Sequence, residues 1–106
     1  MLFDQTVTVY RVADGQVLRR VLHGCSFQKR QEMTEEKGIL RHFFLMVPGQ
    51  TVGLLPGDRI LEGQGPEIGL EQWPEFIPAI VPELVQVKYA KGFSGLGELS
   101  HWEGGA

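Results

Sequence analysis

Thr6-Val-Thr-Val-Tyr-Arg-Val12 and Val17-Leu-Arg-Arg-Val-Leu-His23 decide the fold of this chain, together with the Asp14-Gly15 pair that lies between them. Both stretches are rich in β-branched and aromatic residues, which favour strands over helices. An Asp-Gly pair tolerates the positive φ values that a short hairpin turn needs. Residues 6–23 are therefore predicted to form a β-hairpin, and Gly24 marks a possible bulge or bend after it.

The same period-2 patterning continues along the chain, where Pro-Gly and Gly-Pro pairs separate the apolar runs. The polar stretch from Arg30 to Gly38 is too short for an independent helix and is predicted to be a loop. These patterns together predict an all-β fold, a small single-domain β-barrel or sandwich with an extended loop and a C-terminal arm. Strands are predicted near residues 5–12, 16–29, 39–47, 58–63 and 83–91.

Three prolines recur at four-residue spacing in the segment Gln72-Trp-Pro-Glu-Phe-Ile-Pro-Ala-Ile-Val-Pro82. The spacing is superficially helical, but each proline inside a helix costs about 3 kcal/mol. The segment is therefore predicted to be an extended, edge-like connection. Trp73 and Phe76 within it are interpreted as core or interface packing, because the acidic flanks do not suit a platform on which bases stack.

The chain ends in Ser94-Gly-Leu-Gly-Glu-Leu-Ser-His-Trp-Glu-Gly-Gly-Ala106, which is rich in glycine and contains no lysine or arginine. Glycine is costly in a helix, and the segment has little apolar area to offset its ordering entropy. We therefore divide the chain into a β-barrel domain, residues 1–93, and a glycine-rich C-terminal arm, residues 94–106. Either this arm is a frayed end, or it binds a neighbouring subunit through Leu99, His101 and Trp102.

The charge pattern argues against specific nucleic-acid binding. Residues 1–30 carry a net charge of +3 and residues 31–106 a net charge of −6, and the sequence pI is about 5.5. A specific nucleic-acid binder normally has a basic stripe and a pI above about 9. An acidic face can instead repel DNA or complement a basic neighbour. No apolar run approaches the roughly 20 residues that span a bilayer, and no signal peptide is predicted.

Residues that could carry chemistry are few. His23, His42 and His101 share no metal-ligand spacing with one another or with the single Cys25. His23 and Cys25 are two apart on a predicted strand and are expected to share a face. The single cysteine excludes an internal disulfide and fits a reducing compartment. We predict no catalytic activity, no cofactor and no bound metal.

Four motifs occur in an order that resembles one set of phage proteins. They are Val7-Thr-Val-Tyr10, Val21-Leu-His-Gly24, the Leu55-Pro-Gly-Asp58 turn with the strand after it, and Leu99-Ser-His-Trp-Glu-Gly-Gly105. The order resembles small proteins encoded in the head–tail gene clusters of tailed phages and prophages of low-GC Gram-positive bacteria. Those proteins are longer between the hairpin strands, and the proline-rich residues 72–82 are unusual among them.

That set is similar in size, strand order and gene context to the head-closure proteins, also called stoppers or head–tail connectors. The resemblance implies a structural protein of the virion neck, assembled in the bacterial cytoplasm, and no enzyme. The implied partners are copies of itself in a ring, the portal or adaptor protein and the tail proteins, with packaged DNA only nearby and no membrane. In that family a loop between the second and third strands helps to retain DNA, and the matching residues here are Arg30, Glu32, Thr34, Glu35, Glu36 and Lys37.

Two other readings stay open. A tail-completion or terminator subunit would come from the same gene context. A nucleic-acid-binding barrel of the OB or SH3 type would need exposed aromatic residues interleaved with lysine or arginine on one sheet face, and the sequence gives no sign of such a face.

Overall fold

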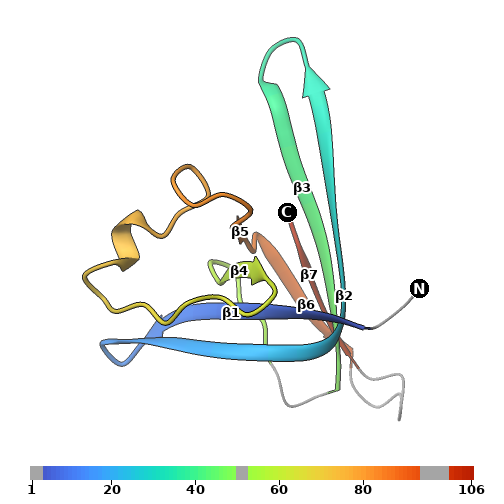
Figure 1. Ribbon diagram of the computed structural model, residues 1–106. Coiled ribbons are helices and arrows are strands. Elements are labelled where there is room, and N and C mark those ends of the chain that lie inside the picture. Colours follow the sequence, from blue (N-terminus) through green and yellow to red (C-terminus); the bar gives the residue numbers. More distant parts are fainter. Residues whose placement is uncertain (1–3, 50–52, 94–100) are drawn as a thin grey trace.

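The computed structural model describes residues 4–49, 53–93 and 101–106, which form one antiparallel sheet that curls into a half-barrel (Figure 1). The strand order is β5-β4-β1-β2-β3-β7-β6, so the first hairpin lies near the middle of the sheet. The prediction of an all-β, barrel-like fold is confirmed. The elements are β1 (Gln5–Ala13), β2 (Gln16–Thr34), β3 (Gly38–Pro48), β4 (Arg59–Glu62), the 3₁₀ helix η1 (Trp73–Glu75), β5 (Val85–Gln86), β6 (Tyr89–Phe93) and β7 (His101–Gly105).

The hairpin of β1 and β2 forms where the sequence predicts it. Asp14 and Gly15 have φ values of 52° and 72°, as a two-residue hairpin turn requires. Ala13 pairs with Gln16 directly across this turn. The Asp-Gly pair therefore fixes the register of the two strands, and with it the side chains that each face presents.

Strand β1 is buried on both faces, so it separates two cores. Val7 and Val9 face the inside of the curled sheet, whereas Thr8 and Tyr10 face the outside. Outside, the Tyr10 ring meets Phe76 edge to face, with ring centroids 4.6 Å apart. The inner core consists of Val7, Val9, Cys25, Phe27, Phe43, Leu45, Val47, Leu54, Ile60 and Val87, and the outer core of Tyr10, Phe76 and Leu84.

Gly24 forms the bulge that the sequence predicts, with a φ of 73°. The pairing shifts here, so that His23 and Gly24 of β2 lie opposite Thr6 alone. One extra residue reverses the faces of everything after it, and Leu22 and Cys25 both pack toward the inner core. The expectation that His23 and Cys25 share a face is therefore wrong, because His23 is exposed and Cys25 is fully buried.

The proline-rich segment is not the extended connection that its sequence predicts. Residues 63–84 consist of bends, an irregular stretch and turns with η1 among them, and they cover the outer side of β1. Pro74 lies in the first turn of η1, where a missing N–H costs nothing. Tyr10 Oη donates a hydrogen bond to the carbonyl oxygen of Pro66 at 2.7 Å. Gly65 approaches the same ring so closely that a Cβ would overlap the hydroxyl group.

The Pro-Gly-Asp turn is a structural anchor. Asp58 is 2% exposed, and its two carboxylate oxygens accept hydrogen bonds from Arg11, both at 2.7 Å. The backbone N–H of Leu55 donates to the same carboxylate at 2.9 Å. The carbonyl oxygen of Gly53 accepts from both Arg11 and Arg20. Asp58 thus ties the start of the second half of the chain to the central hairpin.

Residues 101–105 form a strand of the sheet and not the detached arm that their glycines predict. Strand β7 pairs with β3 on one side and with β6 on the other, so backbone hydrogen bonds offset the ordering entropy. A Cβ on Gly105 would lie 2.7 Å from the carbonyl oxygen of Phe43, so glycine here permits a close approach of strands. Leu99 lies in residues 94–100, outside the described part of the chain.

The Trp102 side chain reinforces this placement. It is half-buried and packs against the inner core. Its ring lies over Gly92, where an added Cβ would meet ring atoms at 3.0–3.2 Å. Trp102 therefore anchors β7 within its own chain. The sequence had predicted instead that Trp102 binds a neighbouring subunit.

Candidate functional site

No catalytic or metal-binding centre emerges from the described residues. Within 4–49, 53–93 and 101–106, no three histidine, cysteine or acidic side chains gather closely enough to hold a metal ion. Burial raises the pKa of Cys25 to about 11, so its thiol is protonated and unreactive at neutral pH. The same residues contain no helix long and apolar enough to cross a bilayer. The absence of enzymatic activity stays a prediction.

The most prominent feature is a two-stranded ribbon, which we define as residues 28–44 at the joined ends of β2 and β3. It projects well beyond the rest of the sheet (Figure 1). Strand β1 pairs with β2 only as far as Cys25, and β7 pairs with β3 only from Phe44 onward. The predicted loop from Arg30 to Gly38 is therefore wrong, because β2 continues to Thr34 and only residues 35–37 form a turn.

The predicted loop residues occupy the outer half of this ribbon. Arg30 and Glu32 share one face with His42 of the opposite strand, and Glu32 Oε2 is 3.3 Å from His42 Nε2. At the tip, the Thr34 hydroxyl accepts a hydrogen bond from the backbone N–H of Lys37 at 3.0 Å. Side chains on both faces meet solvent, which explains the polar sequence. The exposed residues of the tip are Glu35, Glu36, Lys37 and Gly38.

An apolar pair interrupts this polar surface. Met33 and Ile39 are direct cross-strand partners and are 82% and 55% exposed. Cross-strand partners point to the same side of a ribbon, so the two side chains form one apolar spot near the tip. The pair is too small to identify an interaction site by itself, but it shows that the tip is not uniformly polar.

The base of the ribbon is held in place by side chains. Lys29 Nζ forms ion pairs with Glu83 and, at 3.3 Å, with Glu62, and the hydrogen bond to Glu83 is the main reason that the pKa of Lys29 is raised. The Gln5 amide donates to the carbonyl oxygen of Phe27 at 3.0 Å and accepts from its N–H at 2.8 Å, which extends the pairing of β2 past β1. These contacts fix the direction in which the ribbon leaves the body.

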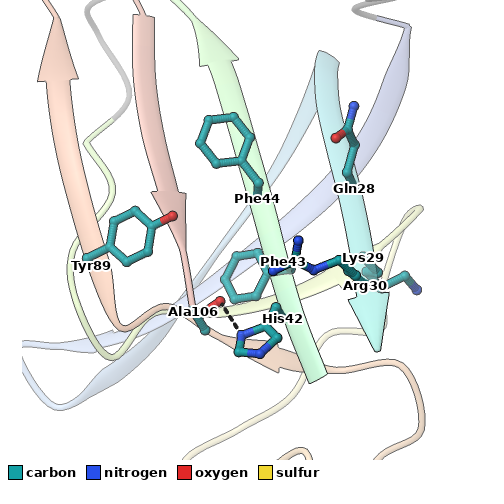
Figure 2. A pocket seen from close by; sticks show the side chains of 8 residues that line it. All are labelled: Gln28, Lys29, Arg30, His42, Phe43, Phe44, Tyr89 and Ala106. Carbon is teal, nitrogen blue, oxygen red and sulfur yellow. Dashed lines mark hydrogen bonds between the residues drawn. The ribbon is translucent and has the colours of Figure 1, made fainter. Parts of the chain in front are cut away.

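A second feature is the outer face of β3, β7 and β6 together with the outward residues Arg30 and Glu32 of β2 beside it, which we call the bare face. Phe44, Gly105 and Tyr89 lie side by side in register across these strands, and Tyr89 is 50% exposed. The Tyr89 ring lies over Gly105, where a Cβ would overlap its hydroxyl group, and a shallow hollow of about 470 Å³ opens beside these residues (Figure 2). Its lining is Gln28, Lys29, Arg30, His42, Phe43, Phe44, Tyr89 and Ala106.

The bare face also carries charge. Lys91 Nζ lies 5.0 Å from the centroid of the Phe93 ring, and His101 stacks on that ring with centroids 4.8 Å apart. Glu103 lies 2.8 Å from His101 Nε2. Sequence reasoning missed this face. The alternation of residues 89, 91 and 93 indicates that these side chains share one face of a strand. Only the pairing with β7 shows which residues lie beside them.

Trp73 and Phe76, the two residues given as a possible interface, pack inside the chain. Phe76 is 6% exposed and contacts Tyr10. The Arg59 guanidinium stacks on Trp73 at 3.7 Å from the ring centroid and donates to its carbonyl oxygen at 2.6 Å. Both side chains hold the proline-rich segment against the sheet, which agrees with the first of the two roles that the sequence predicted, core packing or interface packing.

Comparison of the chain with protein-family models, with curated proteins and with solved structures gives no match.

Proposed function

We propose that this chain is a structural subunit of the neck of a tailed phage. Copies of it form a ring that joins the portal or adaptor of the head to the tail and helps to retain packaged DNA. The observation that carries the proposal is the β2–β3 ribbon, because a ring subunit that closes a channel needs an element that reaches away from its body. The motif order of the sequence supports the same assignment.

The dimensions and chemistry of the ribbon suit this role. From the Gln28–Phe44 pair to the Thr34–Gly38 pair, six residue steps at about 3.4 Å each extend it by about 20 Å. Two strands alone are marginally stable in water, so contacts with other subunits in a ring would reinforce the ribbon. Its three glutamates, Glu32, Glu35 and Glu36, are matched by Arg30, Lys37 and Arg41, so a channel wall made of this stretch would be close to neutral and would not adhere strongly to phosphate groups.

The partners follow from this role. The chain contacts copies of itself, the portal or adaptor protein and the tail proteins, while DNA is only nearby. It acts in the virion after assembly in the bacterial cytoplasm, without a membrane and without catalysis. A tail-completion or terminator subunit remains the alternative within the same particle, and imaging of the purified chain mixed with its neighbouring gene products separates the two by the position of the ring.

A shortened ribbon tests the proposal. Deleting Gln31–Glu32 together with Leu40–Arg41 removes two facing pairs, which shortens the ribbon by about 7 Å and leaves every remaining side chain on its original face. Heads should assemble normally and then lose their DNA. The control, Glu35→Gln with Glu36→Gln, keeps the length and removes charge at the tip. Full DNA retention by particles with the shortened ribbon would refute a stopper role, and absence of the chain from particles would refute the neck assignment.

Nucleic-acid binding is the second candidate, and one observation favours it. The bare face places Phe44, Tyr89 and Phe93 beside Arg30 and Lys91, which is the combination that the sequence did not reveal. Fluorescence anisotropy with a labelled single-stranded oligonucleotide tests this reading. Saturable binding that weakens with salt and disappears in Tyr89→Ala would support it.

A further inference from the structure

The outer side of the sheet is covered over only one of its halves. Residues 63–84 pack on the outside of β1 through Phe76 and Leu84. Across the other half, neither core cluster of the described residues includes an outward side chain of β3, β7 or β6, and Tyr89 and Lys91 on this bare face are exposed. The same sheet surface is therefore buried at one end and open at the other.

The bare face combines aromatic residues with available positive charge. Its carboxylates, Glu32 and Glu103, each lie beside a histidine. Its cations are Arg30 and Lys91, and neither forms an ion pair with any other described residue. Exposed aromatic rings beside unpaired cations would suit an acidic partner that also carries apolar side chains.

The outward side of residues 63–84 has the opposite character. Glu67, Glu71 and Glu75 are exposed, and no ion pair joins them to the described residues. The sequence contains no lysine or arginine between Ile60 and Val87 that could neutralise them. Leu70 and Ile80 are 47% and 59% exposed among these carboxylates. The segment thus presents acid and apolar groups together.

We propose that the bare face of one copy binds residues 63–84 of a second copy. This contact rests on the proposed ring function and names the two surfaces that build the ring. Both surfaces carry apolar groups, and their unpaired charges are opposite in sign. They lie on opposite halves of the sheet, so one copy can use both at once. Two different surfaces in contact form a heterologous interface, which closes into a ring or continues as a filament.

Complementary charge reversal tests the contact. Variant A carries Glu71→Lys and Glu75→Lys, and variant B carries Arg30→Glu and Lys91→Glu. In each variant the two surfaces then carry like charge, and self-association should weaken about tenfold or more. In an equal mixture every A surface meets a B surface of opposite charge, so assembly should return. Sedimentation velocity over a dilution series measures each state, with wild type as reference, and thermal melts check that both variants fold.

Each outcome decides the matter. Assembly of variant A alone with wild-type affinity would overturn the contact, since it would show that the acidic segment is not involved. Arg30→Glu alone serves if variant B unfolds, because Arg30 is exposed, and unchanged assembly would count against the bare face. If rings form but ignore these charges, the contact fails and the ring function survives. A wild-type chain that stays monomeric both alone and with its neighbouring gene products would refute both the proposed contact and the proposed ring function. Oligonucleotide binding that variant B loses and variant A keeps would assign the bare face to nucleic acid instead.

Discussion

Replacing Trp102 by alanine tests whether residues 101–105 form a strand of the sheet in the free protein or belong to an arm that binds only a neighbour. If residues 94–106 were an arm that binds only a neighbour, the change would leave the isolated chain as stable as before. In the structure, the indole packs against the inner core and lies over Gly92. The substitution therefore removes a core contact from the free protein, and its stability should fall.

The magnitude follows from the buried area. A tryptophan buries 150–250 Å² when fully enclosed, and more than half of Trp102 is buried, so we take about 100 Å² as a lower bound for its buried area. At about 25 cal/mol per Å² this area is worth about 2.5 kcal/mol. A compact denatured state lowers that value and the cavity left above Gly92 raises it, so the loss should be about 2–3 kcal/mol. For a domain of this size, the Tm should fall by about 8–12 °C.

Urea unfolding followed by far-UV circular dichroism measures this loss without relying on tryptophan fluorescence. Met33→Ala is the control, because Met33 is 82% exposed and its removal should change stability by less than about 0.5 kcal/mol. Hydrogen exchange of the amides of residues 101–105 in the free protein gives a second reading, since β7 pairs on both sides. A Trp102→Ala variant as stable as the control, with unprotected amides, would show that β7 does not form in solution.

Two further predictions concern single buried positions. Gly105→Ala should lower the unfolding free energy by about 1–3 kcal/mol, because its Cβ would lie 2.7 Å from a backbone carbonyl, whereas Gly104→Ala should cost less, since its nearest neighbour is a leucine methyl group at 3.2 Å; equal losses in urea unfolding would contradict this difference. The Cys25 thiol, with its pKa raised from 9.0 to about 11, keeps its proton in the folded chain at a pH where the unfolded chain loses it. Unfolding free energy should therefore fall as pH rises from about 9 to 11 more steeply in wild type than in Cys25→Ala, and parallel pH profiles would refute the burial of this thiol.

Local signals were enough to predict most of the sheet. The Asp14-Gly15 turn, the bulge at Gly24 and the alternation around Val7 and Val9 are all encoded within a few residues, and the structure bears them out. Strand β7 could not be found this way, because its glycines have low strand propensity. Their value lies in the close approach to Phe43 of β3, a strand more than fifty residues earlier, which no local pattern shows.

The candidate surfaces were harder to predict than the fold. The sequence predicted a functional loop between the second and third strands, because residues 30–38 are polar. In the structure, the ends of these two strands form the ribbon at this place. The β2 arm carries no apolar side chain from Gln28 to Glu32, so it lacks the alternation that identifies a half-buried strand, whereas the β3 arm was predicted as a strand from Ile39. The bare face was invisible for a different reason. Phe44, Tyr89 and Phe93 come from two distant strands, and β7 must lie between them before they form one surface.

The ribbon and the bare face both result from a change of pairing partner along β2. Before Gly24, β2 pairs with β1 and belongs to the body, and residues 63–84 cover the outside of that part. After the bulge its faces are exchanged and its partner is β3, so the strand can leave the body as a ribbon while Cys25 and Phe27 still fill the inner core. A ring subunit needs contacts that leave the tip of the element reaching into the channel free. The division at Gly24 separates these tasks, because the covered half and the bare face can bind neighbours while the ribbon tip stays free of the sheet.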